Sequence, residues 1–247
     1  MADLATTTID FRGHKRFVHY RPKSSDEAVL RDVFGEKVYD IGRLRRGREL
    51  AQYFEAQIRS GKKALVVDAG ANIGATAIWF HLLLGKVRIV AVESSAENFA
   101  VLKKNATGLD IRCVNAAISA TEGLAQVVDP GEGGYWGYQA VPIDRAESRP
   151  GRLLETVPRV TVADLVEAER GRAFPFIVKV DIEGGEADLF SMNTDWIEAT
   201  PLLIVELHDW MLPGEAVSRG FLQAVSRYDR DFVVIGENVF SISNRLT

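Results

Sequence analysis

The segment from Val66 to Phe80, VVDAGANIGATAIWF, constrains the fold more than any other part of the chain. An apolar run ends in Asp68, Gly70 and Gly74 follow within a few residues, and a second apolar run comes after them. This order is typical of a buried strand, a tight glycine turn and the start of a helix. Because glycine has no side chain, such a turn lets a ligand approach the backbone closely. The segment therefore predicts a ligand-binding unit of an α/β protein.

The residues of this turn favour one of two cofactor classes. A dinucleotide site has the pattern G-x-G-x-x-G, with a pyrophosphate on the helix N-terminus, and the third glycine is missing here. The carboxylate of Asp68 would repel a pyrophosphate, but it suits a sulfonium or ammonium group. The turn therefore favours S-adenosylmethionine. A nucleotide-binding oxidoreductase that uses NAD(P) or a nucleotide sugar is the alternative, and a purely structural turn is a third interpretation.

Two further strands are predicted after the glycine turn. The run from Ile89 to Val92 ends in Glu93, whose carboxylate has two acceptor oxygens for the two hydroxyls of a ribose. Glu93 follows Asp68 at close to the roughly 20 residues expected in such a unit. The next strand, Ile111 to Val114, is followed by residues 115–117, which we expect near the adenine edge.

Acidic residues gather at the ends of two later predicted strands. Asp181, Glu183 and Glu186 follow the strand 176–180, and Glu206 and His208 follow the strand 202–205. Ligands of open parallel sheets bind at the carboxyl ends of the strands, and grouped acids are costly to hold together. A histidine beside a carboxylate can serve as a general base. We therefore expect a catalytic role for Asp181, Glu183 and His208, whereas Glu186 is expected to begin the next helix.

The same group of side chains permits a metal-assisted variant of this site. Asp181, Glu183, Glu206 and His208 together offer the ligands of a hard divalent ion that would acidify a hydroxyl. No cysteine–histidine cluster has the spacing of a zinc site, so the principal prediction contains no metal.

The cysteine count and the termini indicate the compartment. Cys113 is the one cysteine, so an internal disulfide is excluded and a reducing compartment fits. The N-terminus has no signal-peptide pattern, and the longest apolar runs are shorter than a membrane span. These features predict a cytoplasmic protein without a membrane span, and nothing in them specifies an oligomeric state.

Charge divides the chain into two parts. Residues 1–63 carry 14 Lys and Arg against 9 Asp and Glu, a net charge of +5, and the remainder carries a net charge of −9. Four arginines, at 43, 45, 46 and 48, lie at a predicted helix start, either as a solvated helix end or as a dock for an anionic substrate. The rest of the chain has no basic stripe, which argues against a nucleic-acid partner. We interpret 1–63 as a basic, partly helical cap and 64–247 as the main domain.

One Gly- and Pro-rich segment interrupts the predicted pattern of strands and helices. It runs from Asp129 to Arg152 and is too long for a simple connection. Tyr135, Trp136 and Tyr138 lie together in it, either to stack on a sugar or flat ring or to fold back onto the core.

Together these motifs resemble the FkbM family of S-adenosylmethionine-dependent methyltransferases. The matching strings are VVDAGANIGATA (66–77), IVAVESSAENFAVLKKN (89–105), VNAAIS (114–119), IVKVDIEGGEADLF (177–190) and LLIVELH (202–208). The K-V-D-I-E-G-x-E string is the most specific, and the resemblance is strongest from Ala64 to His208. Ser94 and Ser95 depart from it, because the family often has proline after the ribose-binding acid.

The resemblance implies a Rossmann-like class I methyltransferase fold, with a mostly parallel seven-strand sheet and a C-terminal antiparallel hairpin. It implies O-methylation of a hydroxyl on a sugar, a glycan or a secondary metabolite, so the partner is a small-molecule or glycan acceptor. Carried over residue by residue, the cofactor-binding set is Asp68, Gly70, Ala71, Asn72 and Gly74 for the methionine part, Glu93 and Ser94 for the ribose, Asn115, Ala116 and Ala117 for the adenine, and Asp181. Asp181 and Glu183 would face the transfer site.

Overall fold

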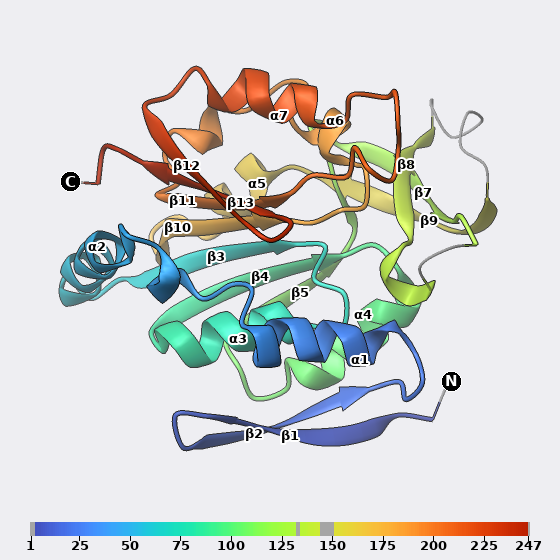
Figure 1. Ribbon diagram of the computed structural model, residues 1–247, viewed down its shortest axis with the longest axis horizontal. Coiled ribbons are helices and arrows are strands. Elements are labelled where there is room, and N and C mark those ends of the chain that lie inside the picture. Colours follow the sequence, from blue (N-terminus) through green and yellow to red (C-terminus); the bar gives the residue numbers. More distant parts are fainter. Residues whose placement is uncertain (1–2, 132–133, 144–150, 247) are drawn as a thin grey trace.

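The computed structural model describes residues 3–131, 134–143 and 151–246, which are organised around a mixed sheet (Figure 1). In spatial order the seven strands described in it are β12 (Arg230–Ile235), β13 (Asn238–Ser243), β11 (Leu202–Glu206), β10 (Ala173–Val180), β3 (Lys63–Ala69), β4 (Val87–Glu93) and β5 (Ile111–Asn115). Strand β13 is antiparallel to both of its neighbours, and the other pairings are parallel. This is the mostly parallel seven-strand arrangement that the resemblance implied, and the predicted C-terminal hairpin is confirmed.

The central strands are apolar on both faces because helices cover both sides of the sheet. Along β3, the side chain of Val66 packs into one hydrophobic cluster, and those of Leu65 and Val67 pack into the other. All three are at most 1% exposed. Such continuous apolar runs are typical of parallel strands buried on both sides.

Two layers of helices flank the sheet (Figure 1). The first layer contains α1 (Ser25–Leu30), which continues as a π-helix (Arg31–Glu36), α2 (Gly47–Arg59), α3 (Ala75–Leu84) and α4 (Ala96–Asn105). The second contains α5 (Val162–Ala168), α6 (Glu186–Leu189) and α7 (Ser218–Val225). Short 3-10 turns lie at Ile41–Arg43, Gly134–Trp136 and Asp195–Ile197. Among the helices described, none has the length and apolarity that a membrane crossing requires.

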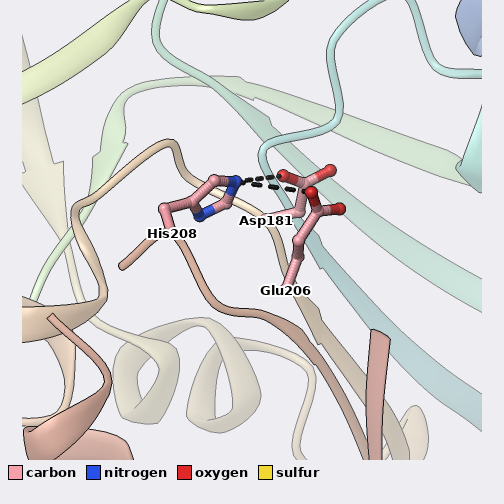
Figure 2. Close-up of side chains that lie close together, drawn as sticks. All are labelled: Asp181, Glu206 and His208. Atoms are coloured by element: carbon pink, nitrogen blue, oxygen red, sulfur yellow. Dashed lines mark ion pairs between the residues drawn. The ribbon is translucent and has the colours of Figure 1, made fainter. Parts of the chain in front are cut away.

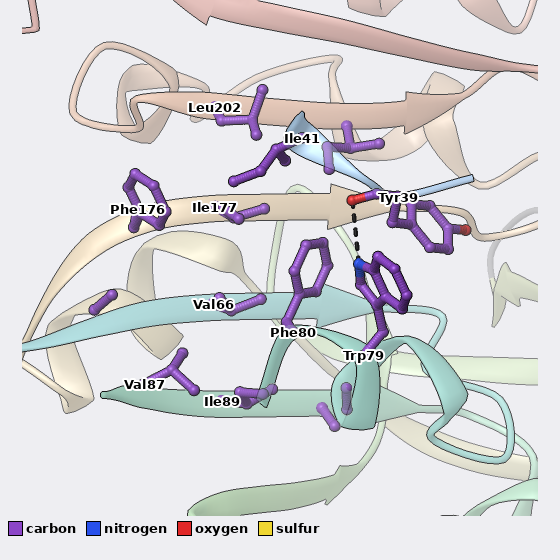
Figure 3. Close-up of a cluster of buried hydrophobic side chains, with 14 of the residues drawn as sticks. Tyr39, Ile41, Val66, Trp79, Phe80, Val87, Ile89, Phe176, Ile177 and Leu202 are labelled. Carbon is purple, nitrogen blue, oxygen red and sulfur yellow. Dashed lines mark hydrogen bonds between the residues drawn. The ribbon is translucent and has the colours of Figure 1, made fainter. Parts of the chain in front are cut away.

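The N-terminal residues contribute to the core of the main sheet. Figure 3 shows Tyr39 beside Trp79 of α3 and Ile41 near Ile177 and Leu202. The indole Nε1 of Trp79 donates a hydrogen bond to the carbonyl of Tyr39 at 3.2 Å. In the basic segment, Arg46 bonds Glu49 and reaches Asp231 on β12 at 3.0 Å. The interpretation of 1–63 as a separate cap stays a prediction.

A hairpin of β1 (Ala5–Phe11) and β2 (His14–Tyr20) lies beneath α1 and α3 (Figure 1). Directly after β2, the guanidinium of Arg21 donates to Asp26 and to Asn98 of α4, at 2.7 Å each. It also lies 3.6 Å from the ring centre of Tyr135. Asn98 in turn donates to the carbonyl of Tyr135 at 2.8 Å. This buried network joins the N-terminal segment, α4 and the aromatic segment.

A second sheet was not expected from the sequence. Its described strands are, in order, β6 (Ala117–Ile118), β9 (Arg152–Val160), β7 (Gly123–Asp129) and β8 (Gln139–Pro142). The Gly- and Pro-rich segment 129–152, in which we predicted no strand, contains β8 at 139–142, which pairs with β7. Within the same segment, 132–133 and 144–150 lie outside the described residues. Two of these strands, β6 and β8, have four residues or fewer, and the burial of β7 and β9 does not alternate regularly, which explains why the pattern in the sequence was weak.

Candidate active site

A close backbone approach joins the ends of β3 and β10. Gly70 has a φ of +77°, and a Cβ built on it would lie 1.7 Å from the carbonyl oxygen of Asp181. The amide of Asp181 donates to the carbonyl of Ala69 at 3.1 Å, so the two strand ends are held together at this point. A residue with a side chain is excluded at Gly70 both by this contact and by the left-handed backbone.

The amides of the glycine turn are used within the protein. Those of Gly70 and Ala71 donate to the carbonyl of Val92, at 3.0 and 2.9 Å. The amide of Asn72 donates to the carboxylate of Glu93 at 2.8 Å. A pyrophosphate site needs free amides at this position, so the geometry disfavours the dinucleotide alternative. Gly74 is the last residue of the turn, has a φ of +85° and directly precedes α3.

The carboxylate of Glu93 is fixed by backbone amides at the end of β4. One oxygen accepts from Asn72 and the other accepts from the amide of Ser95 at 2.8 Å. Burial raises the pKa of Glu93, and these two amides oppose the shift. The side-chain amide of Asn115 donates to the carbonyls of Glu93 and Ser94, at 2.9 and 3.0 Å, and so clamps β5 to β4.

Beyond Asn115 the chain borders a cavity of about 370 Å³. Ala116 and Ala117 are buried, and Ala117 lines the cavity. Gln139 of β8 and Glu183 also line it. The cavity therefore extends from the predicted adenine border to the predicted transfer site.

Asp68 lies beside a buried lysine. Its side chain has no exposed surface, and the ammonium of Lys179 on β10 lies 3.3 Å from it. Lys179 also lies 3.3 Å from Asp181 and donates to the carbonyl of Gly70 at 2.8 Å. Burial alone would lower the pKa of Lys179, but Asp181 and Asp68 outweigh it and hold that pKa well above its ordinary value. Burial raises the pKa of Asp68, which Lys179 opposes.

At the ends of β10 and β11, carboxylates surround one imidazole (Figure 2). The Nε2 atom of His208 lies 3.5 Å from Glu183 and 3.6 Å from both Asp181 and Glu206. Its Nδ1 atom lies 2.8 Å from Glu186. The structure thus brings together Asp181, Glu183 and His208, which the sequence proposed as catalytic.

Burial and like charges shift the pKa values of this cluster. Burial and the charge of Asp181 raise the pKa of Glu183 to about 8 and that of Glu206 to about 7, and His208 opposes both shifts. Burial lowers the pKa of His208, but its hydrogen bond to Glu186 and the surrounding carboxylates raise it to about 10. Perturbed values of this kind are concentrated at functional sites.

Two residues of the site were not assigned a role at this site from the sequence. Lys179 stands inside the apolar run FIVKV, and a lysine in a buried strand must find a charged partner. Glu186 begins α6 as expected, but it also holds His208, a contact that depends on how β11 and α6 meet. The charged residue within an apolar run was a signal for Lys179 in the sequence, whereas nothing in the sequence indicated the contact of Glu186 with His208.

The family model described as the methyltransferase FkbM domain matches residues 68–231. The chain therefore belongs to the FkbM methyltransferase family, which confirms the resemblance of its motifs. S-adenosylmethionine is accordingly the methyl donor, and the oxidoreductase alternative is set aside.

Solved methyltransferase structures give more distant similarities. A precorrin-6y C5,15-methyltransferase from Geobacter metallireducens GS-15 has 10% identity, with 81% of this chain and 88% of that chain covered and a TM-score of 0.39. The N-terminal domain of human METTL16 has 14% identity, with 81% and 69% covered and a TM-score of 0.41. TrmK of M. capricolum, in complex with S-adenosyl-homocysteine, has 11% identity, with 78% and 66% covered and a TM-score of 0.32. No curated protein matches the chain.

Proposed function

We propose that this methyltransferase transfers its methyl group to a hydroxyl of a sugar, a glycan or a secondary metabolite. The observation that carries the proposal is the cluster of Asp181, Glu183 and His208 beside the glycine turn. A hydroxyl must lose a proton when it is methylated, and a buried carboxylate with a raised pKa suits that task. Methyl transfer otherwise depends mainly on aligning the acceptor oxygen with the methyl carbon.

Glu183 is the best-matched proton acceptor of the three candidates. Its pKa of about 8 lies near neutral pH, which favours general-base catalysis. Its side chain is 18% exposed and lines the cavity of about 370 Å³, a volume in the range of small-molecule sites. His208 is 1% exposed and its Nδ1 atom is held by Glu186, so we assign the proton transfer to Glu183.

In the same proposal the cofactor lies along the ends of β3, β4 and β5. The turn from Gly70 to Gly74 borders its methionine part, and Asp68 supports this turn through Lys179, which donates to the carbonyl of Gly70. Glu93 binds the ribose hydroxyls. Each oxygen of Glu93 accepts one backbone amide and keeps a second acceptor position for a hydroxyl. Ser94, Asn115, Ala116 and Ala117 border the ribose and adenine.

Calorimetric titration with S-adenosylmethionine and S-adenosylhomocysteine tests the cofactor site. We expect both ligands to bind and the Glu93→Ala variant to lose at least about tenfold in affinity. Glu122→Gln, on an exposed turn, serves as the matched control. Unchanged binding by Glu93→Ala would contradict the assignment of Glu93, and NADH or NADPH binding in place of the adenosyl ligands would contradict the cofactor.

Mass spectrometry of candidate acceptors tests the substrate class. Monosaccharides, nucleotide sugars and hydroxylated metabolites are incubated with the protein and S-adenosylmethionine, and methylated products are located by fragmentation. We expect O-methyl products, and a fall of about 10²- to 10⁴-fold in turnover for Glu183→Gln with adenosyl binding retained. Methylation confined to nitrogen or carbon atoms would refute O-methylation.

A further inference from the structure

Three potential metal ligands meet at the ends of two adjacent strands. Asp181 follows β10, Glu206 ends β11 and His208 comes two residues later. One ligand atom from each lies within 4.8 Å of the other two. Figure 2 shows the imidazole Nε2 directed at both carboxylates, which approach it from the neighbouring strand end and from its own strand. Atoms at this separation can bind one ion together after small adjustments.

The ring nitrogen that faces the carboxylates forms no hydrogen bond with any residue that the structure describes. His208 is 1% exposed, so its Nε2 atom is a buried polar atom. The nearest oxygens, on Glu183, Asp181 and Glu206, are at 3.5–3.6 Å, which is too long for a hydrogen bond. A buried polar atom without a partner is costly, so its position calls for a ligand.

The opposite ring nitrogen is already held in the way that metal-binding histidines are held. Nδ1 lies 2.8 Å from Oε1 of Glu186, whose side chain is fully buried. When Nδ1 donates its proton to this carboxylate, Nε2 presents a lone pair toward Asp181 and Glu206. Metal-ligating histidines almost always donate their second ring N–H to a carboxylate, a carbonyl or water.

The negative charge of the cluster also exceeds the positive charge that reaches it. Lys179 pairs with Asp181, but it is shared with Asp68. Among the described residues, neither Glu183 nor Glu206 forms an ion pair with a lysine or an arginine. A protonated His208 is the alternative source of positive charge, and it would have to serve several carboxylates through contacts longer than hydrogen bonds.

We propose that Asp181, Glu206 and His208 form a binding site for one divalent cation of the Mg²⁺ or Mn²⁺ type, with Glu183 beside it. Two carboxylates and one imidazole make a mixed oxygen and nitrogen set, which Mn²⁺ accepts readily. Asp181 and Glu206 are partly exposed, at 24% and 17%, so the ion would keep coordination positions open to solvent, and Glu183 beside it lines the cavity.

The chemical use of this ion rests on the proposed O-methyl transfer. A bound divalent cation supplies a Lewis acid that lowers the pKa of a coordinated hydroxyl. The hydroxyl proton passes to the carboxylate of Glu183, and the oxygen lone pair forms the bond to the methyl carbon. The carbon–sulfur bond breaks, and its electron pair stays on the sulfur of S-adenosylhomocysteine.

Manganese binding to the full-length protein tests the site without an activity assay. The purified protein is freed of metal with a chelator, exchanged into chelator-free buffer and titrated with MnCl₂, and free Mn²⁺ is followed by electron paramagnetic resonance. We expect one Mn²⁺ per chain. Asp181→Asn and Glu206→Gln should each weaken binding by about 10- to 100-fold, and Glu122→Gln should leave it unchanged.

Pulsed resonance of the bound ion identifies the histidine ligand. Electron spin echo modulation from nitrogen-14 is expected in the wild type and should vanish in His208→Gln. Circular dichroism confirms that each variant is folded, and Asp181→Asn carries the test where His208→Gln does not fold. Bound Mn²⁺ without nitrogen modulation, or equal affinity in Asp181→Asn, would place the ion elsewhere and overturn the proposal.

A parallel titration with S-adenosylmethionine separates the two proposals. Adenosyl binding without Mn²⁺ binding would overturn the metal site, leave the methyltransferase function standing and indicate a protonated His208. Mn²⁺ binding at the three residues without any O-methylated product would support the metal site and count against the acceptor class.

Discussion

At the end of β4 the carboxylate of Glu93 accepts two hydrogen bonds from backbone amides, whereas at the ends of β10 and β11 several carboxylates crowd around His208. In the first region nearby backbone amides supply the hydrogen bonds of Glu93, since Ser95 is two residues away and Asn72 belongs to the adjacent turn. The second region depends on side chains from separate strands and on α6. The comparison contrasts a preformed group at the end of β4, which we propose binds the cofactor, with a charge-rich group at the ends of β10 and β11, which we propose carries the chemistry.

Replacing Gly70 with alanine should have the largest effect, because this residue joins the two regions. Its Cβ would overlap the backbone carbonyl of Asp181, whose amide is held by a hydrogen bond to Ala69. We expect a loss of more than about 5 kcal/mol in the free energy of unfolding, measured by urea denaturation. Gly61→Ala is the control, because Gly61 also has a positive φ of +87° but nothing within 4 Å. It should cost about 1 to 2 kcal/mol, and equal losses in the two variants would contradict the role of the close approach.

Replacing Lys179 with methionine should break the charge balance of the second region. Asp68 and Asp181 would lose their shared cation, and Asp68 is fully buried. Removing one partner of a buried ion pair costs about 3 to 5 kcal/mol. Lys63→Met provides the comparison, since Lys63 is 54% exposed and pairs with Asp110 at the surface, where the expected loss is below about 1 kcal/mol. A small loss of stability in Lys179→Met would show that the acids are balanced in another way. The same conclusion would follow if adding Asp68→Asn to this variant left its stability unchanged.

The pH dependence of stability should sharpen the contrast between the regions. An unfolded glutamate titrates near roughly 4.3, but Glu183 titrates at about 8 in the folded protein. Between these two pH values the folded state therefore binds a proton that the unfolded state does not bind. The stability that this proton contributes is lost as the pH rises through the folded pKa. With chelator present, we expect about 5 kcal/mol less stability from this group at high pH than at low pH.

Thermal melts of the wild type and Glu183→Gln across this pH range measure that contribution. The variant should show the shallower decline, because glutamine does not titrate. Glu122→Gln should follow the wild-type curve. Identical curves for all three proteins would mean that Glu183 is not protonated in the folded cluster.

The smallest effect is expected at Asn115, which clamps the preformed half. Asn115→Ala removes hydrogen bonds to the carbonyls of Glu93 and Ser94. We expect about 1 kcal/mol of destabilisation and a loss of less than about tenfold in adenosyl affinity, measured by denaturation and calorimetry. Thr107→Ala, which removes a bond on an exposed helix end, is the control. A larger effect on affinity than Glu93→Ala would reverse the order of importance that the geometry indicates.

The parts predictable from the sequence are those with a local cause. The glycine turn, the acid at the end of β4 and the order of apolar runs each depend on residues close in the chain, and the main sheet follows from them. The contact of Glu186 with His208 and the sharing of Lys179 depend on tertiary packing, so no spacing rule reveals them. The second sheet was missed because β6 and β8 are short and because β9 lies at the end of a Gly- and Pro-rich segment.

The position of β10 beside β3 also determines the order in which the molecule can fold. The two strands pair in parallel, yet Asp68 and its partner Lys179 are separated by more than a hundred residues. Synthesis proceeds at about 5 to 20 residues per second, so roughly 5 to 20 s pass between the synthesis of β3 and that of β10. Until then the edge of β3 that pairs with β10 has no partner strand. During that interval Asp68 has no counter-charge from β10, so the centre of the sheet closes only after most of the chain has been made. Variants that weaken this late pairing should therefore show their defect first as low soluble yield during expression.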